Sequence, residues 1–252
     1  MISTVCKASK NTGVDLLMTR PGVLRRISRA VAVATLVGIA VSAQAFKPML
    51  SDDSVSTFKS AVANAKSGQT RQAKAKLDSL LLRRAVRIGV DTSSAPAGRA
   101  AEYRQGIQQS LDIWANALGE RPFVMTTPGE KADLTVRFVR KMPEGGEVQG
   151  AIGAIRRFFW DDRSAGYEIS GGIQIKHNAY GHTLSGVEAG RVMTHELGHL
   201  LGLADDYNGH GVMSAFRLGV GRVTPSDAEV QAVSGFRDEL RNALKVASAP
   251  SR

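Results

Sequence analysis

Residues 194–214 read THELGHLLGLADDYNGHGVMS and concentrate metal-binding side chains more densely than any other part of the chain. The stretch holds three of the five histidines, a glutamate between two of them, and a pair of aspartates. Positions i and i+4 of a helix share one face, so His195 and His199 point the same way and can share a metal ion. Glu196 is rotated by roughly 100° from His195 and can reach a water on that ion without binding the ion itself.

Zinc is the ion that this set of side chains favours. Bound zinc lowers the pKa of its water to about 7. A neighbouring carboxylate can take the proton of that water during attack on a carbonyl and then pass it to the departing amine. The HExxH pattern therefore predicts His195 and His199 as zinc ligands and Glu196 as general base and acid. For the five-residue pattern alone, a surface helix with no metal is the alternative.

The residues after His199 predict a third ligand. Gly202 can adopt the left-handed conformation that ends a helix and turns the chain sharply. Such a turn would carry Asp205 back toward the metal. Asp206 and His210 lie nearby and are the alternative third ligands.

The run HELGHLLGLAD resembles the HExxHxxGxxH/D motif of the metzincin metalloproteases, and VMS at 212–214 resembles their Met-turn, which lies beneath the metal. The aspartate variant is similar to small secreted snapalysin-type endopeptidases. The resemblance implies a zinc endopeptidase that cleaves a protein or peptide bound in an extended conformation, with Met213 supporting the site. Most metzincins have histidine at the place of Asp205. The tyrosine that some branches carry two residues after the methionine is replaced here by Ala215.

The pattern outside the motif is compatible with the fold that the resemblance implies. We expect an α+β domain over residues 85–247, in which a twisted mixed sheet of about five strands packs on two long helices and a C-terminal helix follows the Met-turn. Strands are predicted at 85–91, 123–127, 132–140, 151–160 and 167–178, the last two joined as a hairpin. The resemblance places the GGIQIK run of 171–176 where metzincins pair with extended substrate.

Three helices are predicted in this domain. Apolar residues at helical spacing indicate a helix over 98–119, with Trp114 in the core. Ser185 and Glu188 form a capping box that starts the helix carrying the motif. For the last helix, 224–246, we expect Thr224 as the cap and Pro225 at the first helical position.

The first 45 residues are typical of a secretory signal peptide. A basic flank precedes an apolar run at 30–43, and Ala43-Gln44-Ala45 matches a cleavage site. The expected mature protein is therefore extracellular or periplasmic, without a membrane segment; an uncleaved anchor is the alternative. Six Lys or Arg and one Asp in this segment account for half of the formal charge of +10, so the remainder is only mildly basic and no nucleic-acid partner is expected. The single cysteine, Cys6, also lies here.

Residues 46–84 are predicted to form one or two amphipathic helices, broken near 67–70. A lid or docking arm is one interpretation, and a pro-segment cleaved near Arg83-Arg84 is another. Asp161-Asp162 could bind calcium, but a hairpin turn explains the pair as well and is favoured. We expect a monomer. The rival functions are a non-catalytic zinc-containing binding protein on the same fold and a metal hydrolase of cell-wall amide bonds.

Overall fold

A five-stranded sheet lies at the centre of the computed structural model, which describes residues 49–142, 153–158, 167–179, 181–206, 209–221 and 223–248. Its strands are β1 (Val86–Asp91), β2 (Phe123–Met125), β3 (Leu134–Val139), β4 (Gly153–Phe158) and β5 (Ser170–Lys176), in the order β2-β1-β3-β5-β4. All neighbours are parallel except β4, which is antiparallel to β5. The sheet is therefore mixed and five-stranded, as predicted.

The pairing of β4 with β5 confirms the predicted hairpin strands and corrects one expectation. Phe158 lies opposite Ser170, so the two strands lie side by side and run in opposite directions. Because β5 lies between β3 and β4, the 171–176 run has no free edge, and the edge strand on this side of the sheet is β4. Asp161-Asp162, in the connection between the strands, falls outside the described residues.

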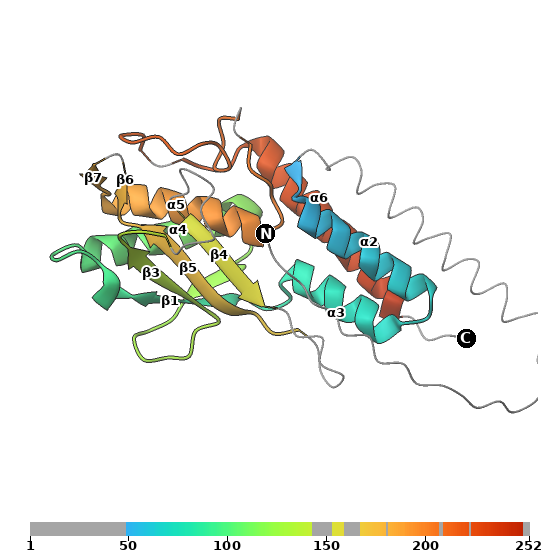
Figure 1. Ribbon diagram of the computed structural model, residues 1–252. Coiled ribbons are helices and arrows are strands. Elements are labelled where there is room, and N and C mark those ends of the chain that lie inside the picture. The colour runs from blue at the N-terminus through green and yellow to red at the C-terminus, as the bar shows by residue number, and fades with distance from the viewer. Residues whose placement is uncertain are drawn as a thin grey trace, which may run out of the picture.

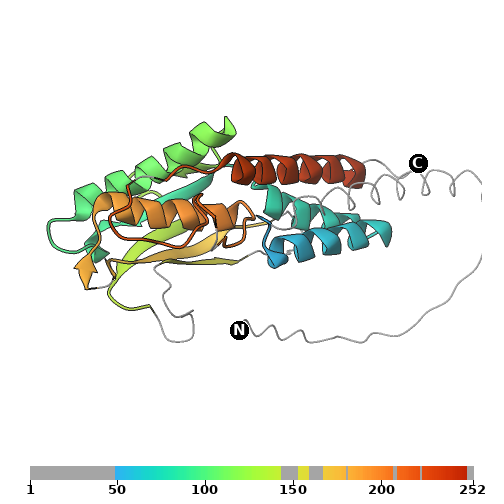
Figure 2. The ribbon, with the colours of Figure 1, turned by 90° about the horizontal axis from the view of Figure 1, so that it is seen from above.

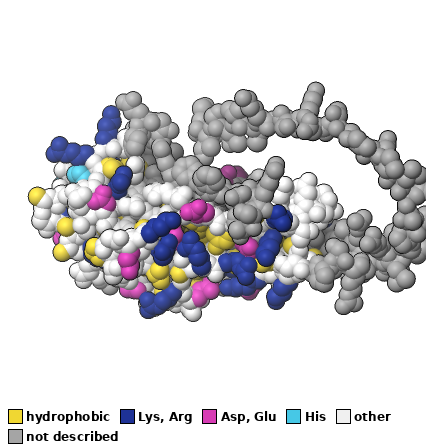
Figure 3. Space-filling view, turned by 90° about the horizontal axis from the view of Figure 1, so that it is seen from below, with side chains coloured by type: hydrophobic (Ala, Val, Ile, Leu, Met, Phe, Trp, Pro, Cys, Tyr) yellow, Lys and Arg dark blue, Asp and Glu magenta, His cyan; other side chains and the backbone are white. Residues whose placement is uncertain are grey.

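Residue alternation along the strands decides which face of the sheet is buried. Ile88, Val136 and Ile173 are fully buried and belong to the core shared with the helices. The other face is more polar and carries the exposed side chain of Arg137, which pairs with Asp91. On the side of the molecule away from α4 and α5, Lys and Arg side chains are interspersed with Asp and Glu (Figure 3).

Helices α4 (Ala100–Leu118) and α5 (Gly186–Leu200) lie together on the buried face of the sheet (Figure 1). Three α4 side chains tie the pair by donating hydrogen bonds to carbonyls of α5 and the residue before its cap: Tyr103 Oη to Leu184 O at 2.8 Å, Ser110 Oγ to Gly190 O at 2.6 Å and Trp114 Nε1 to Thr194 O at 2.9 Å. Trp114 is fully buried, which confirms its predicted place in the core.

A second group of helices stands beside the sheet (Figures 1 and 2). It comprises α2 (Asp52–Lys66), α3 (Thr70–Leu81) and the C-terminal α6 (Asp227–Ser248). Two helices thus occupy the 46–84 segment, with the predicted break between them. Phe58 and Phe236 meet edge to face, with centroids 5.9 Å apart, inside an apolar cluster that all three helices share.

The start of α6 differs from the prediction. The helix begins at Asp227 rather than after Thr224. Ser226 Oγ accepts from the Glu229 amide at 3.2 Å, and the Glu229 carboxylate accepts from the Ser226 amide at 2.6 Å. This reciprocal capping box satisfies two backbone donors, which the Thr224-Pro225 alternative would leave without those partners.

Smaller elements make up the rest of the described secondary structure. A 3₁₀ turn, η2 (Thr92–Ser94), follows β1, and β6 (Asn178–Ala179) pairs with β7 (His182–Thr183) just before α5. None of these was predicted. Together the elements make a mixed α+β fold, which confirms the predicted class. Among the described residues, no helix combines the length and apolar character needed to cross a membrane.

Candidate metal centre

Helix α5 and the turn that ends it position the predicted ligands. The Ser185–Glu188 capping box is present: the Glu188 carboxylate accepts from the Ser185 amide at 2.8 Å, and Ser185 Oγ accepts from the Glu188 amide at 3.3 Å. At the other end Gly202 has φ of +100°, the left-handed region expected for a glycine that reverses the chain. The chain after Gly202 therefore folds back along the helix.

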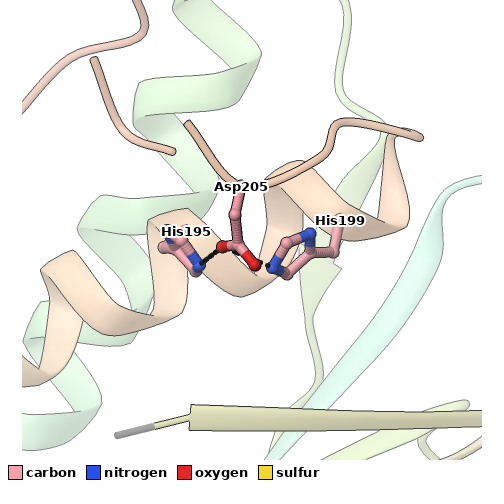
Figure 4. A group of neighbouring side chains, drawn as sticks. All are labelled: His195, His199 and Asp205. Carbon is pink, nitrogen blue, oxygen red and sulfur yellow. Dashed lines mark ion pairs between the residues drawn. The ribbon is translucent and has the colours of Figure 1, made fainter. Parts of the chain in front are cut away.

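The reversal brings His195, His199 and Asp205 together (Figure 4). Asp205 Oδ1 lies 3.1 Å from His195 Nε2 and 3.6 Å from His199 Nε2. One ligand atom from each of the three residues lies within 4.8 Å of the others. Asp206 and His210 are outside this group, so of the three candidates for the third ligand only Asp205 is placed with the histidines.

Backbone carbonyls fix the orientation of both imidazoles. His195 Nδ1 lies 3.0 Å from Val212 O, and His199 Nδ1 lies 3.0 Å from Leu203 O. A carbonyl can only accept, so each Nδ1 carries the proton and each Nε2 of a neutral ring presents its lone pair to Asp205.

The three donors fit a divalent cation. Two lone pairs and a carboxylate oxygen that face one another repel unless a proton or a metal ion lies between them. Two imidazole nitrogens and one carboxylate oxygen form a set that zinc commonly takes in catalytic sites, and carbonyls that hold the far side of each ring are the usual second layer of such a site.

The charge environment of His195 also favours a cation at this site. Burial lowers the pKa of the imidazole, but the hydrogen bond to Asp205, the charge of Glu196 and the Val212 carbonyl together outweigh burial and raise the pKa above its usual value. The surroundings of this ring therefore stabilise a positive charge at its Nε2.

Glu196 is nearly inaccessible, with 5% of its surface exposed. Burial raises the pKa of its carboxyl to about 7; the charge of His195 lowers this pKa and that of Asp205 raises it. Among the described residues no hydrogen bond to this carboxylate occurs. A cation bound beside it would act in the opposite direction and favour the ionised form.

Met213 lies directly against the ligand-bearing helix. Its side chain is 1% exposed, and a Cβ added to Gly198 would come within 2.3 Å of the Met213 sulfur. The glycine inside the HELGH run therefore lets the methionine pack against α5 between the two histidine positions.

Glu229, at the start of α6, contributes to the site in a way that the sequence reasoning missed. Its carboxylate accepts from the Met213 amide at 2.8 Å and from the Val212 amide at 3.2 Å, in addition to the Ser226 amide. Val212 in turn orients His195 through its carbonyl. The Ser-Asp-Ala-Glu run could have predicted the cap, but nothing local indicates its contact with a turn sixteen residues earlier.

Two other histidines do not join the group. His182 is exposed in β7, and His177 follows β5 with a buried Nδ1 that has no hydrogen-bond partner among the described residues. Tyr207, two residues after Asp205, falls outside the described residues. No protein-family model matches the chain, and no curated protein is detectably similar to it.

Proposed function

We propose that the protein is a secreted zinc-dependent endopeptidase of metzincin type. The observation that carries the proposal is the orientation of the imidazoles: two backbone carbonyls hold the Nδ1 atoms, and both Nε2 atoms face the same Asp205 oxygen. The buried carboxyl of Glu196, from the same helical turn as His195, supplies the acid–base group that peptide hydrolysis needs.

Each residue has a definite task in this scheme. His195, His199 and Asp205 would hold zinc, which when bound supplies a Lewis acid and an acidified water. Glu196 would accept a proton from the attacking water at a carboxylate oxygen and deliver it to the nitrogen of the departing amine. Without the ion, burial raises the pKa of this carboxyl to about 7, and the charge of a bound ion would favour the ionised form that accepts the proton. Met213 packs beneath the ligands and does no chemistry.

The sheet edge supports a peptide substrate. Strand β4 is an edge strand, and it contacts α5, which carries the ligands. An extended peptide can add to such an edge through main-chain hydrogen bonds, which fixes the scissile bond without demanding a particular side chain. A protein or peptide in extended conformation is therefore the proposed substrate.

The test is to measure zinc content and casein cleavage by the purified protein, with and without a chelator. We expect one zinc per chain and chelator-sensitive cleavage. Glu196→Gln should keep the zinc and lose cleavage, because the amide cannot accept the proton, whereas His199→Ala should lose both. If the protein binds zinc but cleaves no unfolded protein, the non-catalytic binding protein is favoured instead. If it releases fragments from peptidoglycan but not from casein, the metal hydrolase of cell-wall amide bonds is favoured.

A further inference from the structure

The residues just before α2 pair with the turn that delivers Asp205. We call Met49–Ser51 the N-terminal anchor. Leu50 and Leu203 form an antiparallel bridge, in which the Ser51 amide donates to Gly202 O at 2.8 Å and the Ala204 amide donates to Met49 O at 2.9 Å. These two bonds join residues about 150 positions apart in the sequence.

The bridge is closed off from water by apolar packing. Leu50 is 3% exposed and Leu203 is fully buried. A Cβ added to Gly202 would lie 3.2 Å from Ser54 Oγ in α2 and 3.4 Å from the Phe236 ring in α6. The turn is thus enclosed between the N-terminal anchor, α2 and α6, and it has little room to move.

Two of the three candidate ligands depend on this turn. Leu203, the bridged residue, has its carbonyl on His199 Nδ1, and Asp205 lies two residues further along. Displacement of residues 202–204 would therefore rotate His199 and withdraw Asp205 together. Metal–ligand distances tolerate only about 0.2 Å of change, so even a small shift should weaken binding.

We propose that the N-terminal anchor is a positioning element of the metal site, and that the helical segment behind it remains part of the working protein. The inference rests on the proposed zinc site. It assigns the 46–84 segment a task that neither a lid nor a removable pro-segment performs: the anchor holds the third ligand in place through main-chain hydrogen bonds.

Ser51→Pro and Ser51→Ala form a matched pair for the test in the full chain. Ser51 has φ of −64°, which proline adopts without strain, but the ring carbon would replace the amide hydrogen and collide with Gly202 O. Ser51→Ala keeps the amide but removes the side-chain cap on the Ser54 amide and the hydrogen bond that Ser51 Oγ donates to Ser54 Oγ. Any loss common to both variants thus belongs to the Ser51 side chain.

The dissociation constant for zinc, measured by competition with a chromogenic chelator, is the readout. We expect Ser51→Pro to bind zinc about tenfold or more weakly than Ser51→Ala, in the range seen when groups behind metal ligands are removed. The difference should shrink strongly in an Asp205→Ala background, because the ligand through which the anchor acts is gone. Equal zinc affinity of the two Ser51 variants overturns the inference, whereas a wild-type protein that binds no zinc overturns the proposed function.

Amide hydrogen exchange in the wild-type protein tests the role of the N-terminal anchor even if Ser51→Pro does not fold. Coupling between two sites is reciprocal, so zinc should slow exchange of the Ser51 and Ala204 amides if the anchor stabilises the metal site. The Val86 amide, which donates to Pro122 O at the far side of the sheet, is the internal control. Equal slowing at all three amides, or none at Ser51 and Ala204, contradicts the proposal.

Discussion

Replacement of Glu229 by glutamine tests how the start of α6 supports the candidate metal site. The two carboxylate oxygens accept from the amides of Met213, Val212 and Ser226, and Glu229 is 2% exposed. Glutamine is nearly the same size, but its NH2 group must face at least one of these amide donors. A buried donor left without an acceptor costs about 1–3 kcal/mol, so we expect Glu229→Gln to lower the free energy of unfolding by about 2–3 kcal/mol.

The assay is chemical unfolding followed by circular dichroism, with zinc affinity measured on the same samples. For a chain of this size the expected loss corresponds to about 5–10 °C in Tm. Zinc should bind about 10- to 100-fold more weakly, because Val212 O no longer holds His195 firmly. Ser226→Ala is the control: it weakens the helix cap by about 1 kcal/mol but leaves the contacts of Glu229 to the Val212 and Met213 amides in place. A Glu229→Gln protein that matches this control in stability and the wild type in zinc affinity refutes the reasoning.

Three further predictions concern charge. Asp205→His should keep zinc and move the acidic limb of the kcat/KM profile to lower pH, because a neutral ligand leaves the metal one charge more positive. Burial raises the pKa of Asp133, but hydrogen bonds from Arg84 and Arg87 and the charge of Arg84 outweigh burial and hold this pKa at about 2. The carboxylate therefore stabilises the fold above about pH 4, and the free energy of unfolding should fall by roughly 2 kcal/mol as pH falls from 4 to 2. Urea titrations of Asp133→Asn should lack that loss. Burial raises the pKa of Glu239 to about 7, so ionisation favours the unfolded chain as pH rises from about 4.5 to 7; Glu239→Gln should stabilise the protein at pH 8 but not at pH 4.5.

Local sequence patterns predicted much of the fold. The alternation of Leu134, Val136 and Phe138 produced a strand with those three side chains buried, and the Ser185–Glu188 spacing produced the capping box at the start of α5. These features depend on neighbours within a few residues, which is the range over which backbone periodicity and capping act. The failure at α6 was also local: Pro225 favoured a start after Thr224, but the Ser226–Glu229 pair satisfies more backbone donors.

The long-range contacts that hold the candidate site in place could not be predicted from local sequence patterns. The motif itself indicated His195, His199 and Asp205, and Gly202 takes the left-handed conformation that the turn requires. The bridge between Leu50 and Leu203, by contrast, joins segments whose sequences carry no sign of each other. Such contacts follow from how the helices pack, which one sequence without its fold does not reveal.

Helix α6 has a consequence for anyone who wishes to produce a shorter protein. Its first turn accepts a hydrogen bond from the Met213 amide through Glu229, while Phe236, Leu240 and Ala243 along its length pack in the apolar cluster with α2 and α3. A fragment that begins at residue 85 would keep the histidines but lack α2 and α3. The apolar side chains of α6 would then be exposed to water, and such a surface favours self-association. A shortened version of this protein that keeps this cluster covered should therefore begin no later than Met49.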